Sequence, residues 1–339
     1  MKKLWNSKDY TVFEPVKHTI VETLLEKKNF LPYTREYNNL SYGELIKLIK
    51  DAKKYHWQAL DLSNCGIQYF PDELWELREL RILYLGNNRF FSTGDNNTFL
   101  KIPQKIEQLE SLQVLDLSEK QIKFEDDHTL YLPNLLYLNI YNCNYSKIPK
   151  PLLIPSLTSI HYNCLDSSLS DDLFSLVNLQ YLNLSGSQIS SLPDSVGNLV
   201  NLQYLNLSGS QISSLPGSVG NLVNLQYLNL SGSQISSFPN SLENLRNLQN
   251  LTLSFTPLTS KIPLEIFNQS AIEIIRYVLS QQSTEEKAYF YESKMIIVGQ
   301  GHVGKTSILN RIVNNTYSDE PSTEGIDISS WHFKQQKTT

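Results

Sequence analysis

The chain has 339 residues and a net charge of −5, and 19% of its residues are charged. This mildly acidic balance argues against a nucleic-acid backbone as the main partner. No stretch approaches the roughly 18 apolar residues of a membrane span, and no apolar run follows the first lysines as in a secretory signal. The three cysteines are scattered, which argues against a disulfide framework and favours a cytoplasmic protein.

Residues 1–56 are predicted to form an N-terminal helical segment and cap. Apolar residues at helical spacing begin after a proline, at Val16, Ile20, Leu24 and Leu25, and no chemistry is assigned to them. Ser41 and Glu44 then have the spacing of a capping box, and a helix is expected to run from there to about Lys54. Because the end of a solenoid exposes an apolar cross-section, a helix directly before the first repeat is expected to cover it.

Repeats of about 23 residues dominate the chain. Between Leu176 and Asn244 the sequence LVNLQYLNLSGSQISS recurs with a period of 23 residues, in the frame L-x-x-L-x-L of a leucine-rich repeat. The frame extends to both sides, and its nine starting residues are Trp57, Leu80, Leu112, Leu135, Leu157, Leu179, Leu202, Leu225 and Leu248. The longest spacing contains a polar insertion at 91–98, which is expected to form a loop at one edge. The sequence therefore predicts an α/β fold, with a solenoid of nine repeats and one parallel sheet over 57–267.

Alternation along each short strand sorts the side chains into an inner and an outer set. Leu182 and Leu184 are expected to point into the core, whereas their neighbours point outwards. The outward positions of the three most similar repeats hold Tyr181, Tyr204, Tyr227, Asn183, Asn206 and Asn229. This uncharged aromatic and amide surface suits a protein ligand, and replacing the three tyrosines with alanine is expected to weaken binding with the unfolding midpoint nearly unchanged. The alternative is a solvated face whose regularity reflects repeat duplication alone.

Two cysteines lie where leucine-rich repeats usually place an asparagine after the strand. These are Cys65 and Cys143, and the three most similar repeats have serine there. No C-x-x-C spacing occurs, so the sequence indicates structural thiols in the core rather than metal ligands or nucleophiles.

Residues 268–288 are predicted to hold a connecting helix and a linker. Ser270 and Glu273 form a second capping-box pattern. The apolar residues Ala271, Ile274, Ile275, Val278 and Leu279 share one helical face, which is expected to cover the second end of the solenoid. The polar stretch at 281–287 is interpreted as the linker itself.

Residues 289–339 contain the only stretch that predicts chemistry. An apolar run ending at Val298 is typical of a buried strand, and Gly299–Thr306 then fits the phosphate-binding loop G-x-x-x-x-G-K-[ST] before a helical pattern. In such a loop backbone N–H groups cradle the phosphates, the lysine reaches the β- and γ-phosphates, and the hydroxyl binds Mg²⁺. The expected nucleotide-binding residues are Gly299, Gly301, His302, Val303, Gly304, Lys305, Thr306 and Thr323, of which Thr306 and Thr323 are the expected metal ligands.

Thr323 is included because it belongs to a short motif further along the chain. The stretch Thr323-Glu324-Gly325-Ile326-Asp327-Ile328 resembles the switch segment of Ras-like GTPases, in which a threonine completes the Mg²⁺ shell. An alternating run follows and would form the second strand, so the segment is predicted to be the incomplete βαβ start of a P-loop, Ras-like domain.

The order of these parts resembles the Roco family, in which a Ras-of-complex GTPase domain follows leucine-rich repeats. The resemblance is carried by ELIKLIKDAKKYHWQALDLS at 44–63, the repeats to about Phe267, MIIVGQGHVGKTSILNRI at 295–312 and TEGIDI at 323–328. It implies a GTP-binding signalling or scaffold protein that uses GTP or GDP with Mg²⁺ and binds a protein through its repeats. In the family a domain after the GTPase mediates dimerisation, so a homodimer is expected only in a longer form.

Two motifs of a complete GTPase do not occur in the sequence. There is no D-x-x-G after the second strand and no N-K-x-D for the guanine base, so this chain is not expected to hydrolyse GTP alone. GTP and ATP cannot be told apart without the second motif. Two other interpretations remain open: a pure repeat interaction module whose nucleotide-binding remnant is non-functional, and an ATPase that carries repeats.

Overall fold

The computed structural model describes residues 40–63, 65–86, 101–119, 123–124, 129–143, 145 and 148–282. All of them fall within one compact unit that ends at Thr284, and the second unit, Glu285–Thr339, lies outside the described residues. The expected insertion loop at 91–98 also lies outside them.

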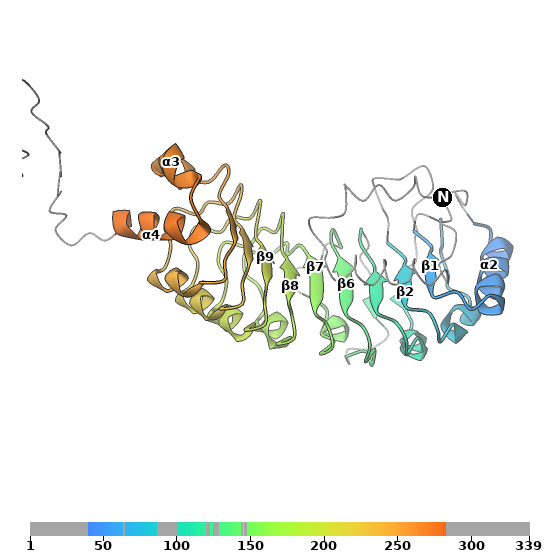
Figure 1. Ribbon diagram of the computed structural model, residues 1–339. Helices are drawn as coiled ribbons and strands as arrows, with labels where there is room; N and C mark the ends of the chain where they lie inside the picture. The colour runs from blue at the N-terminus through green and yellow to red at the C-terminus, as the bar shows by residue number, and fades with distance from the viewer. Residues whose placement is uncertain are drawn as a thin grey trace, which may run out of the picture. The chain divides into compact units, whose positions relative to one another are not determined.

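The described residues form a nine-stranded parallel sheet (Figure 1), as the nine-fold frame predicted. Its strands, in spatial order, are β1 (Ala59–Asp61), β2 (Ile82–Tyr84), β4 (Val114–Asp116), β6 (Tyr137–Ile140), β7 (Ser159–Tyr162), β8 (Tyr181–Asn183), β9 (Tyr204–Asn206), β10 (Tyr227–Asn229) and β11 (Asn250–Thr252). The insertion does not break the stack, because Ile82 of β2 pairs directly with Val114 of β4. Two further short strands, β3 (Lys101–Ile102) and β5 (Lys123–Phe124), pair in parallel with each other.

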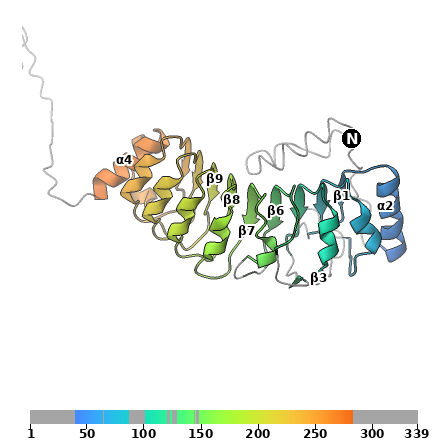
Figure 2. The same ribbon diagram turned by 90° about the horizontal axis from the view of Figure 1, so that it is seen from below.

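Seven of the eight connections between neighbouring strands contain a short 3₁₀ helix on the side opposite the sheet (Figure 2), and the described residues between β4 and β6 contain none. These helices are η1 (Asp72–Glu76), η3 (Gln104–Gln108), η4 (Lys150–Leu152), η5 (Asp171–Ser175), η6 (Asp194–Asn198), η7 (Gly217–Asn221) and η8 (Asn240–Asn244). Most of them begin directly after a proline, for example Pro193 and Pro216, whose ring fixes φ at the entry to the turn. Between the helices and the sheet, leucines such as Leu182 and Leu205 are completely buried.

Helices close both ends of the solenoid, as predicted. At the first end, α2 (Tyr42–Lys54) begins with the expected capping box, in which the Ser41 backbone N–H donates to Glu44 Oε2 at 2.8 Å. The buried face of α2 consists of Leu45, Leu48, Ile49 and Ala52, which join the main core. The apolar stripe that the sequence places on this helix therefore covers the exposed cross-section of the first repeat.

The second cap is longer than the sequence suggested. After η9 (Thr259–Lys261) and the one-turn helix α3 (Leu264–Phe267), α4 (Ala271–Gln282) buries Ala271, Ile274, Ile275 and Val278. The interpretation of residues from 281 onwards as linker is wrong for its first two residues, which belong to α4. The reason is a specific contact: the Gln282 side chain bonds both the N–H and the carbonyl of Phe238, at 2.8 Å each, and so ties the last turn to the stack.

Candidate functional site

The outer face of the sheet carries the candidate binding row. Strand pairing places Tyr181 opposite Tyr204, and Tyr204 opposite Tyr227, so equivalent positions of successive repeats lie directly side by side. The complete first outward row, from β1 to β11, is Ala59, Ile82, Val114, Tyr137, Ser159, Tyr181, Tyr204, Tyr227 and Asn250. The row is therefore apolar at the first three strands, aromatic from β6 to β10 except for Ser159 on β7, and polar at the last strand.

The three tyrosines form a stack of parallel rings. The ring centroids of Tyr181 and Tyr204 are 4.2 Å apart with an interplanar angle of 10°, and those of Tyr204 and Tyr227 are 4.5 Å apart at 6°. These separations are close to the spacing of neighbouring strands, about 4.7–4.9 Å, so identical side chains at identical register stack face to face. The rings thus form one continuous aromatic surface rather than three independent contacts.

Burial decreases along this row toward the end of the solenoid. Tyr181 and Tyr204 are buried, with 1% and 8% of their surface exposed, Tyr227 is half-buried, and Asn250 on the last strand is exposed. The sequence analysis expected that replacing the three tyrosines with alanine would leave the unfolding midpoint nearly unchanged. The burial of Tyr181 and Tyr204 argues against this, because truncation of a buried ring lowers stability. Of the predicted tyrosines, Tyr227 is the one whose ring is open to solvent to an intermediate degree.

The predicted asparagines have a structural role that the sequence analysis missed. The Oδ1 atoms of Asn183, Asn206 and Asn229 accept the backbone N–H groups of the serines two residues on, at 3.0, 3.0 and 2.9 Å. Each bond closes a turn between the strand and a glycine with φ of 69–70°. The signal was present as Asn-x-Ser-Gly, since asparagine favours such turns and glycine adopts positive φ without strain. The turn bond occupies one lone pair of each Oδ1, and because Asn183 and Asn206 are buried, Asn229 is the most open of the three to a partner.

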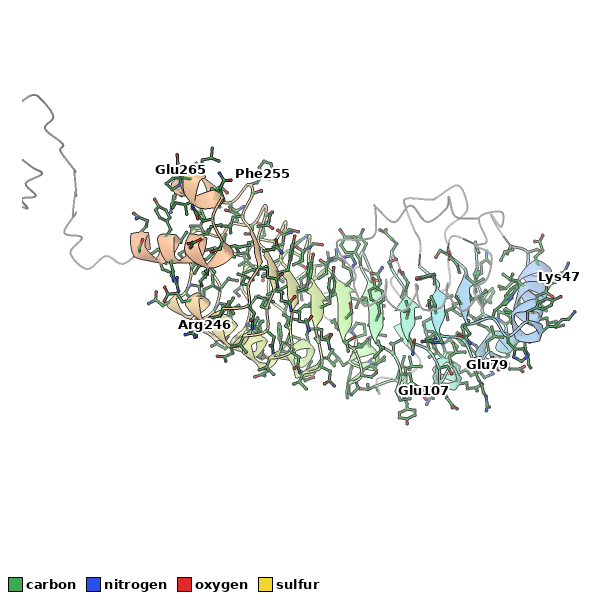
Figure 3. The ribbon with its side chains drawn as sticks, viewed as in Figure 1. Lys47, Glu79, Glu107, Arg246, Phe255 and Glu265 are labelled. Atoms are coloured by element: carbon green, nitrogen blue, oxygen red, sulfur yellow. The ribbon has the colours of Figure 1, made fainter. Side chains whose placement is uncertain are left out.

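A phenylalanine takes the place of this glycine in the last repeat. Phe255 follows the strand β11 at the position of Gly186, Gly209 and Gly232, with φ of 60°, and 91% of its surface is exposed. Figure 3 shows its side chain pointing out of the molecule, at the end of the solenoid that carries α3. The turn after the last strand therefore carries an exposed aromatic side chain that the periodicity did not predict.

The cysteines are buried and free, which agrees with their interpretation as structural thiols. Cys143 Sγ donates to the carbonyl of Leu117 at 3.1 Å, and burial, assisted by the nearby Asp61 carboxylate, raises the pKa of Cys65 to about 12. Over the described parts of the chain, histidine, cysteine and carboxylate side chains form no cluster that could hold a metal ion. Over the same residues, no helix is long and apolar enough to span a membrane.

The predicted nucleotide-binding residues lie outside the described residues. They are Gly299, Gly301, His302, Val303, Gly304, Lys305, Thr306 and Thr323. Their residue types fit a phosphate and Mg²⁺ site, because small residues permit close backbone approach and lysine and threonine supply the charge and the metal-binding hydroxyl.

Family models match two adjacent parts of the chain. Residues 156–293 match a leucine-rich repeat region, and residues 294–339 match the Ras of Complex, Roc, domain of DAPkinase. A repeat region followed by a Roc domain is the arrangement of the Roco family, so the order of the two matches agrees with the resemblance noted in the sequence. The Roc match covers the whole stretch in which nucleotide-binding residues were predicted.

Several longer proteins are similar to part of this chain. Receptor-like protein 35 of Arabidopsis thaliana is 31% identical over 247 residues, which is 54% of this chain and 26% of the relative. Among solved structures, the Toll–Spatzle complex of Drosophila matches with a TM-score of 0.49 and 19% identity, covering 65% of this chain and 35% of that one. The GASSHO1/SCHENGEN3 ectodomain of Arabidopsis thaliana matches with a TM-score of 0.41 and 24% identity, covering 59% and 27%. The chain spans about a quarter to a third of the length of these proteins.

Proposed function

We propose that this protein is a Roco-like signalling or scaffold protein of the cytoplasm. Its repeats bind a protein partner, and the segment after them begins a GTP-dependent switch domain. The observation that carries the proposal is the Roc match at 294–339 directly after a repeat region at 156–293. Neither the repeats nor the phosphate-binding loop alone would indicate this function, because each occurs in many unrelated proteins.

The partner surface is the outer face of the sheet around the tyrosine row. Tyrosine supplies a large, rigid contact area at low conformational cost, and the asparagine amide nitrogens supply hydrogen-bond donors. Contact is centred on the more exposed end, at Tyr227, Asn229 and Asn250, with Tyr181, Tyr204, Asn183 and Asn206 behind them in the same two rows. Because the tyrosines and asparagines of β8 to β10 carry no charge, the partner is recognised there by packing and hydrogen bonding rather than by charge.

The nucleotide is GTP or GDP, bound with Mg²⁺. Lys305 contacts the phosphates, and Thr306 and Thr323 bind the metal ion when the switch is closed. Isothermal titration calorimetry with GTP, GDP and ATP tests this assignment on the whole chain. We expect weak, Mg²⁺-dependent binding that Lys305→Ala abolishes and that Lys294→Ala, which removes an equal charge before the loop, leaves unchanged.

The calorimetry also separates the proposal from its main alternative. Absence of any nucleotide binding, with the solenoid folded, would support a pure interaction module with a non-functional remnant. Equal losses in both lysine variants would show that general charge, rather than the loop, holds the phosphates. Preferential binding of ATP would favour the ATPase interpretation.

A second experiment addresses the protein partner. Proteins captured on the immobilised chain are compared for the unmodified protein, for Tyr227→Ala, and for Val223→Ala, an exposed apolar residue on the turn after η7. A specific partner is lost with the tyrosine variant and retained with the valine variant. A partner retained by both would place the binding surface elsewhere on the protein.

A further inference from the structure

The turns that lead into the strands carry no charge in five successive repeats. Because the strands of the sheet all run parallel, these turns lie along one edge of it. The five turns lead into β6 to β10 and are residues 130–136, 152–158, 175–180, 198–203 and 221–226. The 3₁₀ helices of the same repeats do carry charges, for example Lys150, Asp172 and Asp194. The absence of charge is therefore a property of this edge and not of the repeats as a whole.

Each of these turns also exposes one apolar side chain at the same point. Two residues before the first leucine of the frame lie Pro133, Pro155, Val177, Val200 and Val223, which together are called the edge row. All five are exposed, and the three valines leave 48%, 46% and 48% of their surface open to solvent. A single exposed apolar residue is ordinary in a soluble protein, whereas five in succession form a continuous strip.

Duplication of the repeats does not explain the edge row. The three valine turns read SLVNLQ, NLVNLQ and NLVNLQ, but the two proline turns read LYLPNLL and LLIPSLT. The proline turns therefore differ from the valine turns at most positions outside the leucine frame, and they still place an uncharged apolar residue at the same point. This agreement between dissimilar repeats indicates that the apolar strip is a feature in its own right.

A ladder of asparagines holds the backbone of the edge row in place. Each asparagine donates its Nδ2 hydrogen to a carbonyl of the same edge one repeat earlier, at 2.8–3.0 Å: Asn134 to Glu110, Asn178 to Pro155, Asn201 to Val177, Asn224 to Val200 and Asn247 to Val223. The spacing between successive row residues is thus fixed before anything binds. A surface that is already ordered loses little conformational freedom on docking.

Opposite charges stand at the two ends of the edge row. Glu110 occupies the row position one repeat before Pro133, and Arg246 occupies it one repeat after Val223, near the end that α4 closes (Figure 3). Both side chains are exposed, and within the described part of the chain neither forms an ion pair. The edge is therefore acidic at one end, apolar along five repeats and basic at the other end. Such a pattern is complementary to itself when two copies lie antiparallel.

We propose that the protein forms a two-fold dimer through this edge, with the edge rows of two copies antiparallel and Val177 on the axis. In this register Val200 lies opposite the partner's Pro155, Val223 opposite the partner's Pro133, and Arg246 opposite the partner's Glu110. The row and its charged ends span six steps, about 29 Å at about 4.8 Å per step, and a turn of six residues is at most about 20 Å wide. The contact is then about 600 Å² per copy, near the lower limit of specific interfaces, so dimers are expected at micromolar concentrations.

Charge favours this register over its alternatives. Parallel rows would place Glu110 against the partner's Glu110 and Arg246 against the partner's Arg246, and like charges repel. A shift of the antiparallel rows by one repeat would bring Arg246 opposite the partner's Arg78 or the partner's Pro133. In both shifted registers Glu110 no longer faces an arginine. The register centred on Val177 therefore pairs opposite charges at both ends, and these alternatives do not.

The dimer leaves the outer faces of both sheets free. Its two-fold axis crosses the edge row and runs from the outer face of the sheet toward the side of the 3₁₀ helices, so both outer faces point the same way. On the function proposed above, one dimer would present two tyrosine rows and would hold a partner with two binding sites more tightly than one chain does. This association differs from the one that the family resemblance implies, which needs a domain after the GTPase.

Analytical ultracentrifugation of the whole chain tests the dimer. We expect a concentration-dependent equilibrium of monomer and dimer, which Val177→Asp weakens by more than about tenfold because two carboxylates then meet at the axis. Ser191→Asp adds the same charge at an exposed residue on the turn from β8 to η6 and is expected to leave association unchanged. A chain that stays monomeric at every concentration, or equal association of Val177→Asp and the unmodified protein, would overturn the proposal.

Charge reversal at the ends of the row tests the register. Glu110→Arg alone brings two arginines together at each end of the dimer, and Arg246→Glu alone brings two carboxylates together, so each should weaken association several-fold. Both changes in the same chain restore opposite charges and should restore association. With parallel rows the single variants would leave like charges facing each other as before. Unchanged association of the single variants, or no recovery in the double variant, would therefore contradict the register. Because both side chains are exposed, circular dichroism should show the same unfolding midpoint for all the variants at concentrations at which they are monomeric.

Engineered disulfides locate the axis. The native cysteines are buried, so they are not expected to cross-link two copies. Val177→Cys faces itself across the axis and should give a disulfide-linked dimer on oxidation. Val223→Cys faces Pro133, so it should cross-link only when Pro133→Cys is present in the same chain. Cross-linking of Val223→Cys alone, or none with Val177→Cys, would refute the arrangement. None of these measurements uses a nucleotide or another protein, so the proposed function stands or falls separately.

Discussion

Removal of single rings from the tyrosine stack tests whether the row is structural as well as a binding surface. Tyr204 stacks on a ring at each side and is almost fully buried, whereas Tyr227 stacks on Tyr204 and is half-buried. An aromatic pair contributes about 0.5–1.5 kcal/mol beyond its area burial, and truncation of a buried aromatic ring to alanine costs about 3–5 kcal/mol in a core. We therefore expect Tyr204→Ala to lower the free energy of unfolding by about 3 kcal/mol and Tyr227→Ala by about 1 kcal/mol.

Urea denaturation followed by circular dichroism measures both losses. Tyr131→Ala is the control, because this ring is 68% exposed and its removal is expected to change stability by less than about 0.5 kcal/mol. A double-mutant cycle of Tyr181→Ala and Tyr204→Ala should give a coupling of about 1 kcal/mol, since the two rings touch. Equal losses for Tyr204→Ala and Tyr227→Ala, or losses no larger than the control, would refute the argument from burial and stacking.

Three further predictions concern the backbone and the caps. Gly220→Ala should destabilise the solenoid by about 1–3 kcal/mol, because its added Cβ would lie 2.5 Å from a carbonyl oxygen of the next repeat, whereas Gly217→Ala meets open space and should be neutral in thermal unfolding. Hydrogen bonds from the Ser41 side chain, and then from its backbone, lower the pKa of Glu44 below its ordinary value of 4.5. The stability that these bonds give is therefore present above pH 4.5 and is lost as the pH falls through the lowered pKa. Ser41→Ala should make the stability of the protein less dependent on pH in this acid range. Phe255→Gly should raise stability by about 0.5–1 kcal/mol, because relief of the left-handed backbone outweighs the greater freedom of glycine in the unfolded chain; a loss of stability would contradict this.

The repeat frame and the caps could be predicted because both depend on residues only a few positions apart in the sequence. Each strand contains inward leucines at fixed spacing, and each cap has a serine followed by a glutamate three residues later. The end of α4 was misjudged because polar residues such as Gln282 usually mark a linker. Its amide is instead satisfied by the backbone of Phe238, 44 residues earlier, and no local pattern shows such a contact.

The candidate site was predictable in position but not in environment. Alternation placed Tyr181, Tyr204 and Tyr227 on the outer face, and strand pairing confirms that they lie side by side. Periodicity alone treats every outward side chain as exposed, whereas Tyr181 and Tyr204 are buried and Tyr227 is half-buried. The asparagine turns could have been found, because the pattern Asn-x-Ser-Gly carries both the side-chain acceptor and the residue that tolerates positive φ.

Phe255 shows that the stack, rather than local preference, sets the backbone after each strand. The seventh residue after the first leucine of a frame has positive φ in several repeats, whether it is Glu119, Asn142, Gly209 or Phe255. A left-handed conformation costs a residue with a side chain about 1–2 kcal/mol, and the ring of Phe255 recovers none of this by burial because it is exposed. The strain must be offset by the parallel strand pairing and leucine packing between neighbouring repeats. These contacts join residues 23 positions apart, such as Tyr227 and Asn250. Preference for a conformation at one position is therefore a poor guide in this fold, whereas the period is a good one.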